Sequence, residues 1–346
     1  MKKFYILLVV LLVGTFCWAG NPDRQGEAGA YELLMNPWAR SAGLHTMSTA
    51  NIVGLEAMRL NVAGISRINS FEANVSYANY LQGTDISMNS VGVASRVGKS
   101  GAIAFSLMTL DFGDIEITTV DQPEGTGTSF SPNFFNLGIG YGHTFENKVS
   151  VGIALRVVSE AISDISAFGF AIDAGVQYVT GENDNFKFGI SLRNVGSPMR
   201  FTGEGLGVAS PSPNNGSFEL TLNQRSATYE LPSMLNIGMS YDFLFANIHR
   251  LTVLGNFTSN SFSQDQLGAG VEYSLNELFM LRGAYKVDLG NVDETEEPIY
   301  TGLAAGASIA FPINKENKNT RIALDYAYRN TKVWQGTHNI GLRISL

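Results

Sequence analysis

From Phe71 to its last residue, the chain alternates between large apolar residues and small or polar ones. A clear stretch is FFNLGIGYGHTFENKVSVGIALRVV, residues 134–158, where the alternation is broken only at Glu146 and Asn147. Successive side chains of a β-strand point to opposite faces. The stretch therefore predicts a hairpin with one apolar face and one small, polar face.

The same pattern recurs often enough to predict fourteen strands. We expect them near residues 71–81, 89–98, 101–110, 133–145, 148–158, 168–180, 186–194, 234–245, 249–258, 267–276, 279–288, 302–312, 320–329 and 336–346. Most of these strands are longer than the strands of globular proteins, which usually have about 5–6 residues. Their length matches the about 9–11 residues that a tilted strand needs to cross a bilayer. The pattern predicts an all-β fold, a 14-stranded antiparallel transmembrane β-barrel.

The charged residues of these strands gather on the face opposite the apolar one. They are Arg156, Asp173, Lys187, Arg193, Asp242, Glu272, Arg282, Lys286, Asp325, Arg329 and Arg343. The rest of that face is mostly Gly, Ser, Ala and Asn, whereas a solvent-exposed sheet face would carry far more Lys and Glu. This pattern predicts an enclosed polar lumen with charged side chains and an outer face that meets lipid.

The lengths of the connections between strands alternate between short and long along the chain. Connections after the even-numbered strands are short, whereas those after odd-numbered strands include residues 111–132, 195–233 and 289–301. Transmembrane barrels have short periplasmic turns and longer outer loops. We therefore expect a multi-pass protein of the outer membrane of a Gram-negative bacterium, with the long loops outside.

Residues 1–19 have the pattern of a secretory signal peptide. Lys2 and Lys3 precede a short apolar run, and cleavage is expected after Ala19. Lipidation at Cys17 is the alternative interpretation. Cleavage after Ala19 would remove the single cysteine of the chain and would exclude disulfides and cysteine metal sites from the mature protein.

Residues 20–70 do not follow the alternation. A short helix is expected from Ala50 to Leu60, which would bring several apolar side chains to one side. The segment is long and apolar enough to need burial, and the lumen is the available place. We therefore expect residues 20–70 to be an amino-terminal plug and residues 71–346 to be the barrel.

Composition agrees with a membrane barrel. Charged residues make up 16% of the 346 residues, against about 25% in typical soluble domains, and glycine is abundant, with 37 residues. Beyond the signal peptide, no stretch is apolar and long enough for a transmembrane helix. The net charge of -8 and the scattered Lys and Arg residues argue against nucleic acid as a partner.

Candidate chemistry is sparse. The four histidines lie far apart in the sequence, and His143 and His338 are expected near a barrel rim. No common hydrolase, zinc-protease or nucleotide-binding motif is present. A cluster of Asp242, His249 and a distant serine on the barrel wall is the enzymatic alternative. We predict a protein that is not an enzyme and uses no cofactor or metal.

Two loop regions carry further alternatives. The acidic stretch from Asp288 to Glu297 would bind calcium or a basic partner, or would be an ordinary solvated loop. Residues 203–217 are rich in Gly, Pro, Ser and Asn and predict a mobile outer loop. A hairpin at about 217–230 would extend above the membrane, where it would touch a ligand or partner or cover the pore.

The amino-terminal segment resembles the signature of the PorV/PorQ family, outer-membrane proteins related to the FadL long-chain fatty acid transporters. Family members open with a Gly-rich lead, an Ala-Arg pair, a Gly-rich stretch and Asn-Pro-Ala-Gly before the first strand. The matching pieces here are Gly26 to Ala30, Ala39-Arg40, Ala42-Gly43-Leu44 and Asn61-Val62-Ala63-Gly64. Val62 stands where the family has proline.

The resemblance implies a fourteen-stranded barrel with an amino-terminal plug, associated with the type IX secretion system. It also implies roles for three plug residues. Asn61 and Gly64 would shape the turn into the first strand, and Arg40 would pair with a luminal carboxylate such as Asp173 or Asp325.

Three functional hypotheses follow. The first is a plugged barrel that binds secretion-system proteins or secreted cargo as an assembly component of type IX protein secretion. The alternative is a FadL-like transporter of hydrophobic small molecules, in which a kink or gap in the barrel wall releases the ligand into lipid. The third is a structural barrel within a larger complex. The residues on the inward face of the strands are mainly small and polar, which favours the first hypothesis. In the second hypothesis, apolar residues of the plug would line a tunnel.

Overall fold

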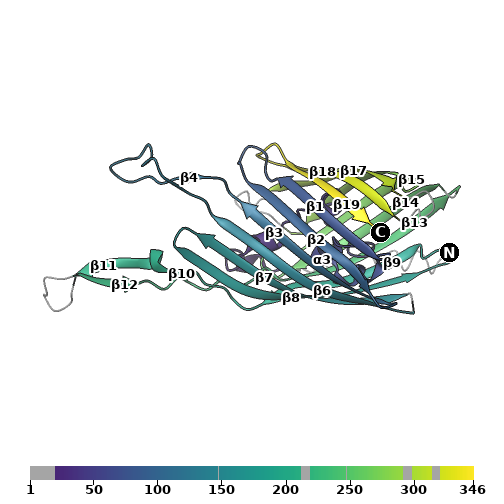
Figure 1. Cartoon of the computed structure of the whole chain (residues 1–346), viewed down its shortest axis with the longest axis horizontal. Helices are drawn as coiled ribbons and strands as arrows, with labels where there is room; N and C mark the ends of the chain where they lie inside the picture. Colours follow the sequence, from purple (N-terminus) through teal and green to yellow (C-terminus); the bar gives the residue numbers. More distant parts are fainter. Residues whose placement is uncertain (1–19, 147, 212–218, 247, 291–297, 314–319) are drawn as a thin grey trace.

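The computed structural model describes residues 20–146, 148–211, 219–246, 248–290, 298–313 and 320–346. The expected signal peptide lies outside these ranges, as does most of the acidic loop. Fourteen long strands of the described chain form a closed antiparallel sheet (Figure 1). They are β1 (Phe71–Asn79), β2 (Ser87–Val97), β3 (Gly101–Asp111), β6 (Asn133–Phe145), β7 (Val149–Ile162), β8 (Ile165–Thr180), β9 (Phe186–Gly196), β13 (Met234–Phe245), β14 (His249–Asn260), β15 (Gln266–Leu275), β16 (Phe279–Asp288), β17 (Tyr300–Pro312), β18 (Arg321–Thr331) and β19 (Thr337–Ser345). The predicted barrel is confirmed.

The ring closes where the first and last strands meet. β1 pairs with β19, with Val75 opposite Leu342, and β9 joins β8 to β13. Within the described strands, the register shifts between β8 and β9 and between β17 and β18. β3 keeps a continuous register with both neighbours, β2 and β6.

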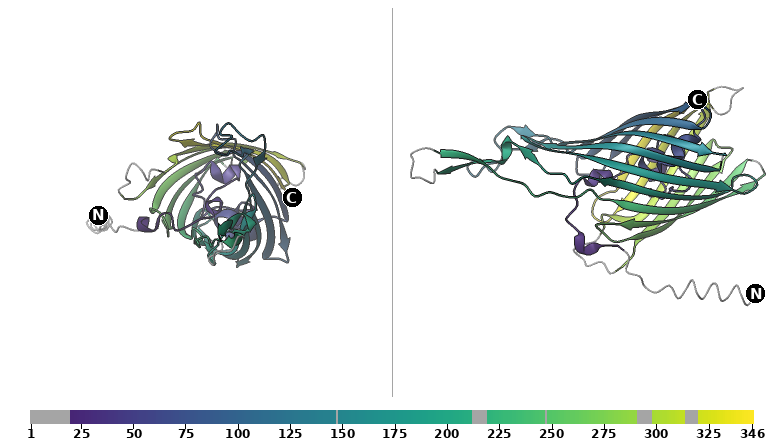
Figure 2. Two further views of the ribbon diagram at one scale, coloured as in Figure 1. Left: turned by 90° about the vertical axis from the view of Figure 1, so that its left-hand side faces the viewer. Right: turned by 90° about the horizontal axis from the view of Figure 1, so that it is seen from below.

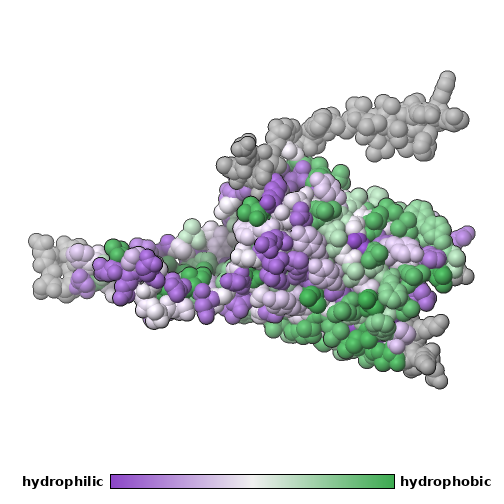
Figure 3. Space-filling model, turned by 90° about the horizontal axis from the view of Figure 1, so that it is seen from above, coloured by the Kyte–Doolittle hydropathy of each residue, from purple (hydrophilic) through white to green (hydrophobic). Residues whose placement is uncertain are grey.

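The alternating apolar side chains of each strand face outward. Side chains such as Ile153, Leu281 and Leu324 are more than half exposed, and they recur around the barrel. Figure 3 shows hydrophobic surface over the barrel and hydrophilic surface toward the end with the projecting hairpin. No described helix has the length and apolar character needed to span a membrane. The barrel therefore has the exposed apolar wall of a transmembrane β-barrel.

The long connections project from one end of the barrel, which we call the loop end; the opposite end is the turn end (Figure 1). Their short elements are β4 (Ile115–Glu116), β5 (Ser129–Phe130), β10 (Thr202–Gly203), η4 (Glu204–Leu206), β11 (Gly207–Pro211) and β12 (Glu219–Asn223). The hairpin predicted at 217–230 is instead formed by β11 and β12, with Val208 opposite Leu222. Its expected second strand fails because Tyr229 pairs with Met199 at the barrel mouth.

The amino-terminal segment, residues 20–70, has little regular structure. Its elements are η1 (Pro22–Arg24), η2 (Tyr31–Leu33), α2 (Ala39–Ala42), α3 (Ala57–Leu60) and η3 (Val62–Arg67). The helix expected over Ala50 to Leu60 is limited to α3. Gly54 has a φ of 91°, a left-handed conformation that a helix cannot include. Its backbone passes against Glu72, whose carboxylate accepts a hydrogen bond from the Leu55 amide at 2.9 Å.

Most of this segment lies inside the ring of strands (Figure 2). The main hydrophobic core lies between the segment and the wall, and it includes Trp38, Leu55, Met58 and Ile65. η3 packs against β6, β7 and β8, whereas α2 packs against β17, β18 and β19. The segment therefore bridges opposite walls of the barrel.

Candidate functional site

Inward-facing glycines mark where the segment touches the wall. A Cβ atom added at each of six such positions would come within 3.0 Å of a segment atom: Gly92, Gly140, Gly152, Gly175, Gly189 and Gly268. Glycine permits this approach because it has no side chain. The sequence pattern predicts that the small residues on the inward face of the strands line a polar lumen. In the structure, they make room for the segment along much of the wall.

Two of the predicted plug residues hold the turn before the first strand. The Asn61 side chain donates to the Val176 carbonyl oxygen on β8 at 3.0 Å. Its own oxygen accepts from the Ala63 amide at 3.3 Å, which caps η3. Gly64 passes so close to Ile52 that an added Cβ would lie 2.2 Å from the Ile52 carbonyl oxygen.

The third predicted plug residue, Arg40, makes a different ion pair from the one expected. Its Nε lies 3.8 Å from an oxygen of Glu56, within the same segment. The expected partners are already occupied, because Asp173 is 2.5 Å from Arg156 and Asp325 is 3.4 Å from another arginine of the wall. The expectation that Arg40 pairs with Asp173 or Asp325 is therefore corrected.

All seven luminal charged residues singled out from the sequence lie on the inner face. They are Arg156, Asp173, Asp242, Glu272, Arg282, Asp325 and Arg329, each at most 9% exposed. Most are paired across strands, as in the Arg282–Glu272 contact of 2.5 Å and the Lys187–Asp242 contact. Cross-strand pairing compensates the cost of burying these charges.

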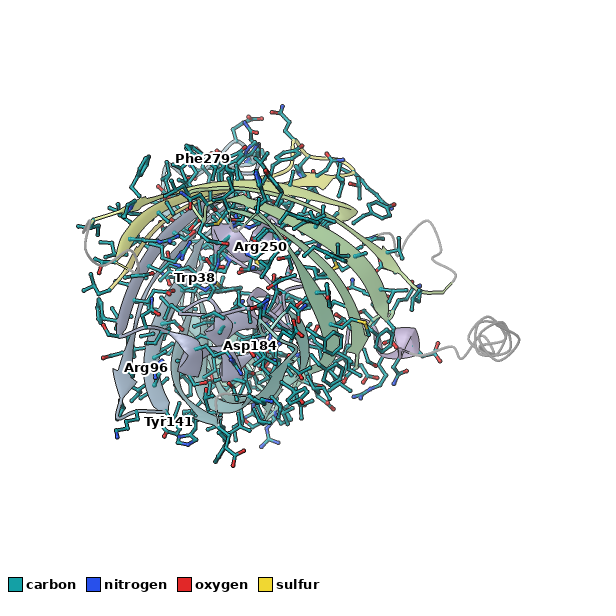
Figure 4. All side chains as sticks on the ribbon, turned by 90° about the vertical axis from the view of Figure 1, so that its right-hand side faces the viewer. Trp38, Arg96, Tyr141, Asp184, Arg250 and Phe279 are labelled. Carbon is teal, nitrogen blue, oxygen red and sulfur yellow. The ribbon has the colours of Figure 1, made fainter. Side chains whose placement is uncertain are left out.

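A charged cavity of about 350 Å³ lies at the turn end. Its lining includes six arginines and three glutamates: Arg40, Arg67, Arg250, Arg282, Arg321, Arg343, Glu72, Glu272 and Glu277. An adjoining space of about 310 Å³ shares Arg40 and Arg250 and extends to Asp242. Figure 4 shows Arg250 and Trp38 inside the ring, with Phe279 at its outer surface. An apolar molecule would find few favourable contacts among these charges.

A second cavity, of about 300 Å³, lies at the loop end and is amphipathic. Its apolar lining comes from both segment and wall: Tyr31, Leu34, Met35, Met47, Tyr80, Met234, Ile299 and Tyr300. Its cations are Arg193, Lys286 and Arg329, and none of the described residues in the lining is acidic. Arg329 also lies 4.8 Å from the centre of the Tyr300 ring, as a cation–π contact.

His45 is a buried polar group in the lining of the loop-end cavity. The side chain is 4% exposed, and neither ring nitrogen has a hydrogen-bond partner. Burial lowers the pKa of His45, and the nearby Lys286 and Arg329 lower it further. The neutral imidazole packs edge-on against the Tyr300 ring, with the ring centroids 5.7 Å apart.

One turn of the segment separates the two cavities. His45, Thr46 and Met47 line the loop-end cavity, whereas Leu44 lines the space at the turn end. Leu44 and Met47 pack against Leu254 and Ala284 of the wall. His45 and Thr46 have φ values of 48° and 64°, and left-handed conformations of this kind cost about 1–3 kcal/mol each in non-glycine residues. The divider is thus a single, strained layer.

The structure does not assemble the enzymatic alternative. Asp242 faces the lumen, where it accepts from Thr252 at 2.6 Å, whereas His249 contacts Tyr273 at 2.7 Å. The two expected rim histidines make the same kind of contact, as in the 2.8 Å pair of His338 with Tyr326. Within the described residues, no group of three or more His, Cys, Asp and Glu side chains could hold a metal ion.

Sequence reasoning missed the loop-end cavity as a site. Lys286 and Arg329 were recognised as luminal charges, but His45 lies in the irregular segment and was given no role. The signal that could have found it is chemical: a histidine within an otherwise apolar and small stretch, flanked by Leu44 and Met47. Only the fold shows that these residues meet strands more than 200 positions away.

No model of a protein family matches this chain, and no curated protein is similar to it in sequence. Solved structures share its fold. The Pseudomonas putida toluene transporter TodX is 12% identical, with 90% of this chain and 98% of that chain covered and a TM-score of 0.54. The Ralstonia pickettii toluene transporter TbuX is 12% identical, with 96% of this chain and 100% of that chain covered and a TM-score of 0.53. The CymD monoaromatic hydrocarbon channel is 14% identical, with 89% of this chain and 96% of that chain covered and a TM-score of 0.52.

These similarities concern the fold, since the identities are only 12–14%. They support the expected barrel fold, because their matches cover nearly the whole of both chains. They do not show the PorV/PorQ relationship or a link to type IX secretion. The neighbours are channels or transporters by name, which is consistent with a non-enzymatic protein.

Proposed function

We propose that this protein is an outer-membrane channel for hydrophobic small molecules, which it binds first in the loop-end cavity. The carrying observation is the amphipathic lining of that cavity, where Leu34, Met35 and Met47 face aromatic side chains of the wall. Ligand pockets typically have volumes of about 300–1,000 Å³, so this cavity suits a compact molecule. The toluene transporters with the same fold support this choice over a role in secretion.

The cations of the cavity indicate a ligand with an acidic group. Asp173 lies near Arg193 and Asp288 near Lys286, whereas Arg329 forms no ion pair among the described residues. A bound anion would compensate the burial of Arg329. Arg193 and Arg329 donate to main-chain oxygens of the segment, at 3.2 and 3.3 Å, and these contacts orient them. A carboxylate beside these groups would place the apolar part of the ligand against the methionines.

In this proposal, residues 20–70 act as the plug that closes the barrel at rest. The glycine contacts of residues 49–66 lie on the wall from β2 to β13, whereas most of the wall residues that line the two cavities come from β13 to β19. Passage therefore follows the latter wall and requires the turn at residues 44–47 to move. The strain in His45 and Thr46 lowers the free-energy cost of that movement, because it is released when the turn rearranges.

Binding of 2-naphthoate and naphthalene to the purified full chain tests this function. We expect both to bind and naphthoate to bind more tightly. Replacing Lys286 and Arg329 by glutamine is expected to weaken naphthoate binding about tenfold or more, because hydrogen bonds to charged groups contribute about 1.5–3 kcal/mol. Naphthalene binding should change little. Isothermal titration calorimetry gives both affinities.

The exposed Lys148→Gln variant is the matched control, because Lys148 lies in the turn between β6 and β7. It should leave both affinities unchanged. Absence of binding for both molecules, in a barrel that is folded, would contradict the proposed function. Equal weakening of naphthalene and naphthoate would contradict only the role of the cations.

A second candidate function is the PorV/PorQ-like role in type IX protein secretion, and the projecting hairpin favours it. Val208, Leu220 and Leu222 lie on one face of β11 and β12 and are exposed beyond the barrel mouth. Exposed apolar side chains in such a ribbon suit a protein partner. Gentle extraction from the native membrane followed by mass spectrometry separates the candidates. Stoichiometric recovery of a secretion barrel or cargo supports the second, and a lone barrel with a small hydrophobic ligand supports the first.

A further inference from the structure

The amino-terminal segment holds the base of the projecting arm, which we define as residues 197–231 apart from 212–218. Ala28 forms a parallel bridge with Glu230, and the Gly29 amide donates to the Glu230 carbonyl oxygen at 3.0 Å. Within the arm, Met199 and Tyr229 exchange two main-chain hydrogen bonds, of 2.8 and 2.9 Å. The arm is therefore anchored through residues that lie about 200 positions apart in the sequence.

A small apolar cluster lies beneath this junction. It joins the segment, the ends of β7 and β8 and the arm: Ala30, Leu33, Val158, Ala167, Ala171, Met199 and Leu231, with Phe201 and Tyr229 packed against it. The Tyr229 ring lies directly on Gly29, where an added Cβ would be 2.3 Å from a ring carbon. Release of the arm would expose this cluster to water.

Two carboxyl groups are buried at the edge of the cluster. Glu32 is 2% exposed and Glu160, near the loop end of β7, is 5% exposed. The Tyr229 hydroxyl donates to Glu160. One Glu32 carboxyl oxygen has no hydrogen-bond partner. The three groups thus connect the segment, the barrel wall and the arm.

The surrounding arginines do not neutralise this pair. Arg59 of α3 donates to the main-chain oxygens of Glu32 and Met35, and Arg193 of β9 donates to the main-chain oxygen of Leu33. Near Arg59, Arg156 and Asp173 already form an ion pair. Farther out, Arg24 pairs with Glu27 and Glu230 at the surface. Among the described residues, no arginine forms an ion pair with Glu32 or Glu160, although Arg59 lies close enough to lower the pKa of Glu32 somewhat.

Burial raises the pKa of Glu32 to about 8, and the neighbouring Glu160 contributes to the rise. Burial and Glu160 also raise the pKa of Tyr229, so its hydroxyl keeps its proton and stays a donor. In the docked arrangement, Glu32 is therefore mostly protonated at neutral pH.

We propose that Glu32, Glu160 and Tyr229 form a proton-dependent latch, which keeps the arm docked on the amino-terminal segment and releases it as the pH rises. Docking buries a carboxyl group that must keep its proton, because ionising it would place a charge in an apolar cluster beside a second carboxyl group. Release lets Glu32 ionise in water. The latch concerns the arm and is independent of the ligand proposed for the loop-end cavity.

The sign and size of the effect follow from linkage. Docked Glu32 has a pKa of about 8, and released Glu32 would have its ordinary value of 4.5. Docking is therefore fully stable below about pH 4.5 and weakens as the pH rises through the interval up to about 8. The ratio of released to docked arm should rise roughly tenfold for each pH unit in that interval and level off above it.

Thiol accessibility at the arm base measures this release in the full chain, in detergent or lipid vesicles. Met199→Cys reports on the cluster, and Met58→Cys, in α3 of the segment, is the matched control, since both methionines are 1% exposed. The labelling ratio of the two cysteines, read by peptide mass spectrometry, removes the pH dependence of the thiol itself. Between pH 5.5 and 7.5, we expect this ratio to rise at least tenfold.

The Glu32→Gln variant separates the latch from general loosening, because glutamine cannot ionise. In this background, the ratio should stay constant across the same pH range while the barrel remains folded by its heat-dependent mobility in gel electrophoresis. A rise of equal size in Glu32→Gln, or no rise in the unaltered latch, would overturn the proposal. Should Glu32→Gln not fold, Glu160→Gln takes its place. The ratio should then rise less than in the unaltered latch, because burial still raises the pKa of Glu32 but the neighbouring carboxyl group is gone.

Discussion

Replacing Gly152 by valine is expected to displace the amino-terminal segment and to open an ion-conducting path through the barrel. A Cβ atom at Gly152 would lie 2.5 Å from the carbonyl carbon of Val62 and 2.6 Å from the Ala63 nitrogen. Both are main-chain atoms at the start of η3, so no side-chain rotation relieves the clash. Overpacking of this kind costs about 1–3 kcal/mol, and we expect the larger part of that range because the backbone must shift.

Conductance in planar lipid bilayers measures the displacement, and thermal unfolding measures its cost. Gly283→Val is the matched control: Gly283 lies on β16, and an added Cβ there meets no atom within 4 Å. The control should keep both the low conductance and the stability of the unaltered chain. If Gly152→Val behaves like the control, the segment does not close the barrel through its contact with β7.

The alternation of residues sufficed to predict the barrel, because a strand exposed to lipid on one face must repeat an apolar residue at every second position. Ile153 and Leu281 follow this rule, and both are exposed on the outer wall. The rule says nothing of what the other face meets. The inward glycines fit either a polar lumen or a closely packed segment, and only the contact of Gly152 with Val62 decides between them.

The candidate site was less predictable for a similar reason. The segment has no periodic pattern, so its path depends on contacts between residues far apart in the chain, such as the hydrogen bond from Asn339 to Pro37 at 2.9 Å. Arg40 pairs with Glu56 of its own segment, a choice that depends on which wall carboxylates are already occupied. Sequence identified the luminal charges individually, but it could not assign their partners.

The bulge between β8 and β9 illustrates such a long-range dependence. Arg193 and Asn194 both lie opposite Asp173, and Asn194 has a φ of 59°. The Asp173 carboxylate accepts from the Asn194 amide at 2.7 Å and from Arg156 at 2.5 Å. Arg156 also donates to the Met58 carbonyl oxygen of the segment at 2.8 Å. One carboxylate therefore holds the bulge, the wall and the segment together.

Replacing Asp173 by alanine is accordingly expected to destabilise the barrel by about 3–5 kcal/mol, the usual cost of leaving one partner of a buried ion pair uncompensated. The measurement is urea-induced unfolding in lipid vesicles. The surface variant Glu27→Ala, which removes one of the two partners of the exposed Arg24, is the control and should leave the stability nearly unchanged.

A second comparison identifies the cause of that loss. Asp173→Asn keeps an oxygen that can accept from the Asn194 amide but removes the charge, so Arg156 loses its ion-pair partner and the nearby Arg193 and Arg59 lose a compensating carboxylate. Combining it with Arg156→Met removes the nearest unpaired charge, and we expect part of the stability to return, because buried ion pairs replaced together by uncharged groups often cost little. If the double variant is less stable than Asp173→Asn, the hydrogen bond from Arg156 to Met58 contributes more to stability than the ion pair does. The segment would then stabilise the barrel through Met58, and displacing it through Gly152 should lower the stability of the wall as well as open the path.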